Sequence, residues 1–146
     1  MSKPHLLIVE ARFYADLADE QASGAIEAIE AAGASWERVS VPGALEIPAA
    51  VKYASSRQDR PFDGFVALGC VIRGETSHYD SVCNESARGL QDLAIIYDLA
   101  IGNGILTVEN FDQAWARANR NEKNKGAGAA EAALALINIK SSFGAK

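Results

Sequence analysis

The segment of residues 66–80 constrains the fold of this 146-residue chain more than any other. It opens with a continuous apolar run at 66–72, which is typical of a strand buried on both faces. A polar loop interrupts the run, and a helical spacing of apolar residues starts at about Tyr79. This loop therefore follows the carboxyl end of a strand, where open α/β sheets bind ligands. The free N–H groups of the following helix favour an anion there.

His78 is the first candidate catalytic residue. It is one of only two histidines in the chain, and the other is His5. A single histidine at the start of a helix is often a surface or capping residue. The glycine, glutamate, threonine and serine around His78 favour a functional interpretation. A histidine with an ordinary pKa of about 6.5 can both accept and donate a proton near neutral pH.

The rest of the chain alternates strand-like and helix-like patterns. Strands are expected at residues 6–9, 35–41, 66–72 and 99–106, and helices at 15–32, 48–56, 79–96, 111–118 and 127–142. This order predicts one domain over residues 1–146, an α/β three-layer α/β/α sandwich with a four-stranded parallel sheet.

Composition and missing motifs exclude several functions. A net charge of −5 argues against a nucleic-acid-binding protein, and no apolar run reaches the ~20 residues of a membrane span. Residues 1–5 lack the apolar core of a signal peptide, and Cys70 and Cys83 have no zinc-site spacing, so we expect a cytoplasmic protein with reduced thiols and no metal. Glycine-rich dinucleotide and ATP motifs and a Gly-x-Ser-x-Gly elbow are also missing.

Each of three further features has two possible interpretations. Phe13 follows the first strand, as either a core residue or a platform for a ligand. Glu46 precedes the helix that Pro48 begins, and it either interacts with the helix dipole or presents a carboxylate to a hydroxyl-rich or amine ligand. The basic residues between 117 and 125 form either a solvated linker or an anion site.

Taken together, these residues resemble the lumazine synthase family. The resemblance covers nearly the whole chain, and its most specific parts are residues 41–48 and 68–80, supported by 104–107, 113–114 and 124–126. It implies a flavodoxin-like fold and a role in riboflavin biosynthesis without a cofactor. The implied reaction condenses 5-amino-6-(D-ribitylamino)uracil with 3,4-dihydroxy-2-butanone 4-phosphate to 6,7-dimethyl-8-ribityllumazine, and releases phosphate and water.

The resemblance also implies roles for particular residues. Phe13 matches the aromatic residue that stacks on the pyrimidine, and Asn103 lies where many members carry an aromatic residue that closes the pocket. His78 matches the histidine credited with proton transfer. The residues implied to contact the ribityl chain and the heterocycle are Ala44, Leu45, Glu46, Val71 and Ile72. Those implied to bind or approach the phosphate are Glu75, Thr76, Arg117 and Lys125.

Two alternatives remain at this stage. One is an enzyme in which Cys70 is a nucleophile and His78 its base, although no Asn or Asp is evident to orient the histidine. The other is a carrier of lumazine or flavin on the same fold, with little catalysis. Such a carrier would not need His78 and Arg117.

The resemblance further implies a homo-oligomer whose active sites are shared between adjacent subunits, with Arg117 and Lys125 coming from the neighbour. Members of the family form pentamers, and some join twelve pentamers into a shell. Only residues 1–5 precede the first strand, Pro4 cannot donate a ladder hydrogen bond, and the turn at 119–124 has no glycine. These features predict a pentamer or a dimer of pentamers.

Overall fold

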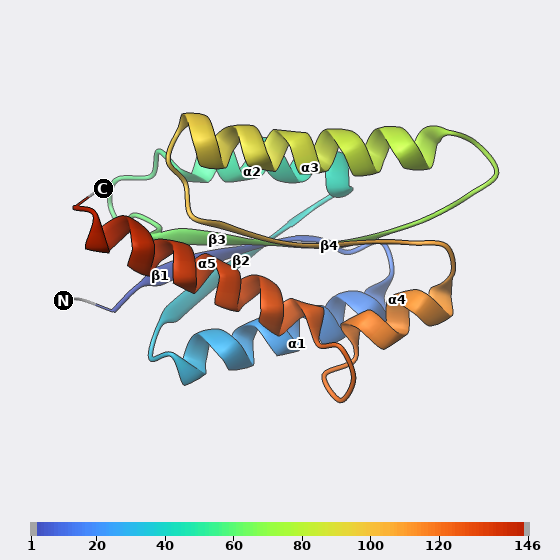
Figure 1. Cartoon of the computed structure of the whole chain (residues 1–146), viewed down its shortest axis with the longest axis horizontal. Helices are drawn as coiled ribbons and strands as arrows, with labels where there is room; N and C mark the ends of the chain where they lie inside the picture. Colours follow the sequence, from blue (N-terminus) through green and yellow to red (C-terminus); the bar gives the residue numbers. More distant parts are fainter. Residues whose placement is uncertain (1–2, 145–146) are drawn as a thin grey trace.

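The computed structural model describes residues 3–144 (Figure 1). The elements in order are β1 (His5–Ala11), α1 (Ala15–Ala31), β2 (Ser35–Val41), a 3₁₀ helix (Ala44–Glu46), α2 (Ile47–Ala54), β3 (Gly64–Ile72), α3 (His78–Ile96), β4 (Ile101–Val108), α4 (Phe111–Ala118) and α5 (Lys125–Ser142). The predicted alternation of strands and helices is confirmed.

The four strands form one parallel sheet in the order β2-β1-β3-β4. Helices α2 and α3 cover one face of the sheet, and α1, α4 and α5 cover the other (Figure 1). The predicted three-layer sandwich is therefore confirmed, with the strand order of the flavodoxin-like fold. No helix among the described residues is long and apolar enough to cross a membrane.

Alternate side chains of β1 enter two separate cores. Leu7 and Val9 belong to the core beneath α2 and α3, whereas Leu6 and Ile8 belong to the core beneath α1 and α5. Both faces of a central parallel strand are covered by helices, and this explains the continuous apolar runs in the sequence.

Close packing of α5 on β4 depends on a glycine. A Cβ atom at Gly102 would lie 1.8 Å from the carbonyl oxygen of Ala129, so no larger residue fits without moving the helix. The facing side of α5 is built from alanines that are almost completely buried, namely Ala129, Ala130 and Ala133. A glycine inside a strand usually marks a close backbone approach or a bulge, and Gly102 marks a close approach.

Three of the four strands differ in extent from the prediction: β1 begins one residue earlier and ends two residues later, β3 begins two residues earlier, and β4 is shifted by two residues toward the carboxyl end. The first strand continues through Ala11, because the carboxylate of Glu10 is paired with Arg12 and Arg38 and can be buried. The last strand begins at Ile101 and continues to Val108 because Thr107 and Val108 pair with the end of β3. At the carboxyl ends of β1 and β4, a polar residue, Glu10 or Thr107, resembles the start of a loop in the sequence.

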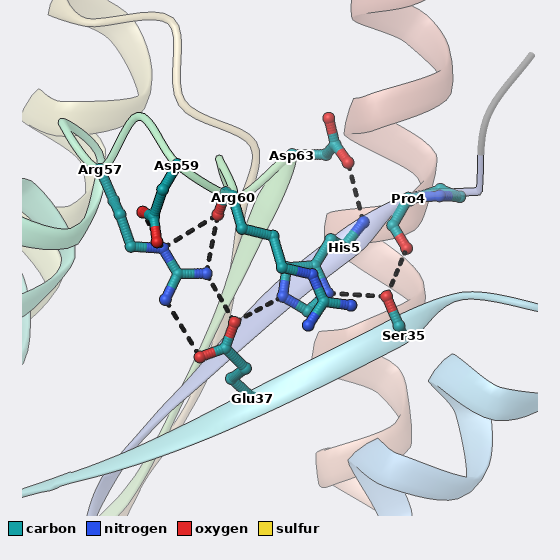
Figure 2. Close-up of polar contacts among 8 residues, drawn as sticks. All are labelled: Pro4, His5, Ser35, Glu37, Arg57, Asp59, Arg60 and Asp63. Carbon is teal, nitrogen blue, oxygen red and sulfur yellow. Dashed lines mark hydrogen bonds and ion pairs between the residues drawn. The ribbon is translucent and has the colours of Figure 1, made fainter.

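A polar cluster joins the amino ends of the strands (Figure 2). The ring nitrogens of His5 lie 2.6 Å from Ser35 Oγ and 2.7 Å from Glu37 Oε2, and Arg57 donates to Glu37 at 2.5 and 3.1 Å. Hydrogen bonds from Arg57 and then His5 lower the pKa of Glu37 to about 2. The ring of Phe62 stacks on His5 with 5.2 Å between centroids. This cluster ties β1 and β2 to the loop before β3, at the far end from the carboxyl edge.

We predict that Gly102→Ala destabilises the fold by about 1–3 kcal/mol or more, because the added methyl group must displace the backbone of α5. The control is Gly74→Ala, since a Cβ there meets no atom within 4 Å. That variant should change the free energy of unfolding by less than about 1 kcal/mol. Urea unfolding at one protein concentration measures both variants, and equal stability of the two would contradict the packing argument.

Candidate functional site

A cavity of about 420 Å³ lies beyond the carboxyl ends of β1 and β3. These strands are neighbours, but the chain leaves β1 toward β2 and leaves β3 toward β4, in opposite directions along the sheet. The helices that follow them, α1 and α3, therefore lie on opposite faces (Figure 1). Such a reversal leaves a crevice above the strand ends, which is where doubly wound sheets bind ligands.

Four segments of chain supply the walls of this cavity. The residues that line it are Ala11, Phe13, Tyr14, Pro42, Gly43, Ala44, Leu45, Glu46, Cys70, Val71, Ile72, His78 and Val82. Seven of the residues that the sequence singled out therefore meet in one place: Phe13, Ala44, Leu45, Glu46, Val71, Ile72 and His78.

The aromatic platform at Phe13 is exposed rather than part of the core. Phe13 is 77% exposed, and its ring lies nearly perpendicular to the Tyr14 ring, with 4.9 Å between the centroids. The interpretation of Phe13 as a core residue is therefore wrong. An exposed aromatic ring at the edge of a cavity offers a face on which a planar ligand can stack.

His78 is the first residue of α3, and its exposed side chain borders the cavity. Its backbone N–H donates to Thr76 Oγ1 at 3.3 Å. Arg73 stabilises the start of α3 by two contacts. Its guanidinium lies over the Tyr79 ring, 4.3 Å from the centroid, and pairs with Glu109 at 3.0 Å. These contacts join the first turn of α3 to the end of β4.

The other predicted residues lie elsewhere. Asn103, Arg117 and Lys125 border a second cavity of about 420 Å³, between β4, the end of α4 and the start of α5. The two cavities share no residue. Glu75 and Thr76 are exposed in the loop between β3 and α3 and border neither cavity. One chain thus carries the predicted site in two separate parts.

Several residues of the first cavity were missed by the sequence analysis as site residues. Ala11 is the last residue of β1, and the rule that ligands bind at strand ends could have identified it. Cys70, which the sequence suggested only as a possible nucleophile, also borders the cavity, near the end of β3. Val82 lies four residues after His78 on the same face of α3, so helical spacing carried a signal. Tyr14, Pro42 and Gly43 adjoin predicted residues.

Cys70 is poorly suited to act as a nucleophile. It is half-buried, and burial raises the pKa of its thiol to about 11. A reactive cysteine needs the opposite shift, because the thiolate is the nucleophile. In the described part of the chain, no three His, Cys, Asp or Glu side chains are grouped so that they could hold a metal ion.

The fold and the first cavity define a flavodoxin-like protein with a small-molecule site at the switch point of its parallel sheet. Comparison with known proteins specifies this class further. The model of the 6,7-dimethyl-8-ribityllumazine synthase family matches residues 3–141. The chain belongs to this family.

The relatives that this chain resembles match it over nearly its whole length. The 6,7-dimethyl-8-ribityllumazine synthase of Agrobacterium fabrum is 60% identical over 99% of both chains. The 6,7-dimethyl-8-ribityllumazine synthase 1 of Rhizobium meliloti is 60% identical over 97% of this chain and 95% of its own. The Bartonella bacilliformis synthase is 57% identical over 97% and 93%, respectively.

We predict that Cys70 in the folded protein reacts slowly with iodoacetamide at pH 7.5. With a pKa of about 11, less than roughly one thiol in a thousand is ionised at that pH. The labelling rate should rise about tenfold per pH unit up to pH 9.5, and the urea-unfolded chain should react far faster. Mass spectrometry of the Cys70 peptide gives the rates. Rapid labelling of the folded protein with loss of activity would restore the nucleophile hypothesis.

Proposed function

We propose that this chain, as a single cytoplasmic domain, is a 6,7-dimethyl-8-ribityllumazine synthase of riboflavin biosynthesis. It condenses 5-amino-6-(D-ribitylamino)uracil with 3,4-dihydroxy-2-butanone 4-phosphate. The observation that carries this proposal is the meeting of Phe13, Glu46 and His78 at one cavity, in a chain 60% identical to a synthase over 99% of its length. Both substrates are small enough for a site of this kind.

The first cavity has the chemistry that the pyrimidine substrate needs. The exposed face of Phe13 can stack on the planar ring. Among the described residues, no side chain pairs with the Glu46 carboxylate, so its oxygens are available to accept hydrogen bonds from ribityl hydroxyls. Ala44 and Leu45 would contact the same chain, while Val71 and Ile72 offer backbone groups to the heterocycle at the end of β3.

His78 would move the protons of the reaction. The substrate amine attacks the ketone, and loss of a first water gives an imine. The phosphate is then eliminated, and the ribityl-bearing amine closes the ring by attack on the remaining carbonyl, with loss of a second water. The amine must lose protons, and the departing water must gain one, so a group that both accepts and donates is useful. Orientation of the two substrates would supply much of the rate, because the uncatalysed reaction must bring two molecules together.

The phosphate needs cations that the first cavity lacks. Within residues 3–144, no lysine or arginine borders that cavity, whereas Arg117 and Lys125 border the second cavity. Glu75 and Thr76 would contribute only loop contacts close to the start of α3. The planar donors of Arg117 suit a phosphate group, and charge-assisted hydrogen bonds to phosphate are strong. We therefore propose that the second cavity of one copy, with Asn103 as part of its wall, completes the first cavity of a neighbouring copy.

This arrangement requires a homo-oligomer, for which a pentamer or a dimer of pentamers is our proposal. The turn at 119–124 no longer argues against a shell, because Asn124 adopts a left-handed backbone conformation (φ 45°) without glycine. Part of the segment before the first strand, residues 1–2, lies outside the described residues. A carrier role is less well supported, since Arg117 and His78 suit a reaction that releases phosphate.

We predict that the purified protein forms 6,7-dimethyl-8-ribityllumazine from the two substrates, and that His78→Ala lowers the turnover roughly tenfold to a thousandfold. Arg117→Ser should raise the KM for the phosphorylated substrate much more than the KM for the pyrimidine. Stopped-flow absorbance of the product measures both. Binding of the product without any turnover by the unmodified protein would favour the carrier.

We predict that His78→Ala and Arg117→Ser subunits, refolded together, regain about a quarter of the unmodified activity. In a ring of randomly mixed subunits, roughly one contact in four joins an intact first cavity to an intact second cavity. Each variant refolded alone is the control. If both residues act within one chain, mixing restores nothing.

Sedimentation velocity should give five or ten times the 15.5-kDa chain mass, and a megadalton particle would refute this assembly.

A further inference from the structure

A buried carboxylate lies behind the aromatic platform of the first cavity. Glu10 is only 2% exposed, near the end of β1. Its Oε2 accepts from Arg38 Nε at 2.7 Å, and its Oε1 accepts from Arg38 Nη2 at 3.0 Å and from Arg12 Nη1 at 2.7 Å. The other guanidinium nitrogen of Arg12 pairs with Asp19 on α1. Two carboxylates and two guanidiniums thus connect β1, β2 and α1.

A buried charged network is unusual in this strand, because the other buried side chains after His5 are all apolar. A buried carboxylate is tolerated only when it is paired and hydrogen-bonded, and Glu10 meets this condition with three donors. Hydrogen bonds to Asp19 and Glu10 raise the pKa of Arg12, so its charge is retained at any physiological pH. An apolar residue at position 10 would fill the same core without these partners, so the network suggests a role beyond packing.

The network fixes the residue that precedes Phe13. Side chains alternate along a strand, so Glu10 lies on the α1 side of the sheet while Ala11 borders the cavity. Arg12 turns back to Glu10 and Asp19, and Phe13 again borders the cavity. The Phe13 ring is 77% exposed, so packing does little to hold it. Its position depends mainly on a backbone that Arg12 anchors.

We propose that Glu10, acting through Arg12, is a positioning residue that holds Phe13 at the distance from β3 that the pyrimidine ring requires. This proposal rests on the proposed function of the first cavity. Arg12 is suited to the task because its planar fork holds Glu10 with one nitrogen and Asp19 with the other. A lysine ammonium would keep the charge but not this two-sided geometry.

The polar cluster of Figure 2 provides a matched control. Glu37 also binds an arginine by two hydrogen bonds, and its strand, β2, is the one that carries Arg38. It lies at the amino end of the sheet, however, where His5 and Phe62 are its neighbours rather than the cavity. Glu10→Gln and Glu37→Gln therefore remove the same charge from the two opposite ends of one sheet.

The first measurement does not depend on catalysis. The chain has five phenylalanines, so protein labelled with 4-fluorophenylalanine gives a simple ¹⁹F spectrum, in which Phe13→Leu and Phe62→Leu assign two resonances. We expect Glu10→Gln to shift or broaden the Phe13 resonance and to leave that of Phe62 in place. Glu37→Gln should do the reverse. Arg12→Lys, which retains the charge, should reproduce the effect of Glu10→Gln on Phe13.

The second measurement uses the two substrates. Glu10→Gln and Arg12→Lys should lower kcat/KM for the pyrimidine roughly tenfold to a hundredfold, through a higher KM, while the KM for the phosphorylated substrate changes less than about twofold. Glu37→Gln should leave both KM values unchanged. If Glu10→Gln does not fold, Arg12→Lys carries both measurements.

Two results would overturn the proposal: a Phe13 resonance that is unchanged in both network variants, or an equal loss of affinity for both substrates. An equal loss would mean that the network only stabilises the fold. If the unmodified protein lacks turnover while the fluorine spectra behave as expected, the proposed function fails, but the structural link from Glu10 to Phe13 stands.

Discussion

The reversal of chain direction between β1 and β3 determines where this protein can bind a ligand. These two strands lie side by side at the centre of the sheet, yet their following helices, α1 and α3, cover opposite faces. Neither helix can close the space above the strand ends, so a cavity remains at this place. The location of the cavity therefore follows from the topology.

Two kinds of contact make this topology stable. On the face opposite α3, Gly102 and the small residues of α5 allow helix and strand backbones to approach closely. At the two ends of the β1–β2 pair, ion pairs replace apolar contacts: Glu37 with Arg57 at the amino end, and Glu10 with two arginines at the carboxyl end. Only the Glu10 network lies next to the cavity, because Ala11 and Phe13, the chain neighbours of Arg12, border it. The same chemistry therefore has different consequences at the two ends of the sheet.

Much of this structure could be predicted from local patterns. The apolar run of β3 and the alternation of elements indicated a parallel sheet, and strand-end position drew attention to Phe13 and His78. The burial of Glu10 could not be predicted in this way. Its partner Arg38 lies 28 residues away, and a glutamate followed by an arginine resembles a loop when read locally. Long-range charge pairing, rather than local propensity, extended β1 by two residues.

The division of the predicted site residues into two cavities also depends on three-dimensional geometry. Arg117 and Lys125 follow β4, which is an edge strand, whereas Phe13 and His78 follow the two central strands. A sequence motif gives no distance between these groups.

This division restricts how copies of the chain could complete the site. The two cavities are different surfaces, so a contact that joins the first cavity of one copy to the second cavity of another is heterologous, that is, head-to-tail. Repetition of such a contact produces a ring when its rotation closes. In a closed ring every first cavity meets a second cavity, so there are as many complete sites as chains. An open chain of copies would leave an incomplete site at each end, and a monomer would have none. A closed ring is therefore the assembly in which every proposed phosphate site is complete.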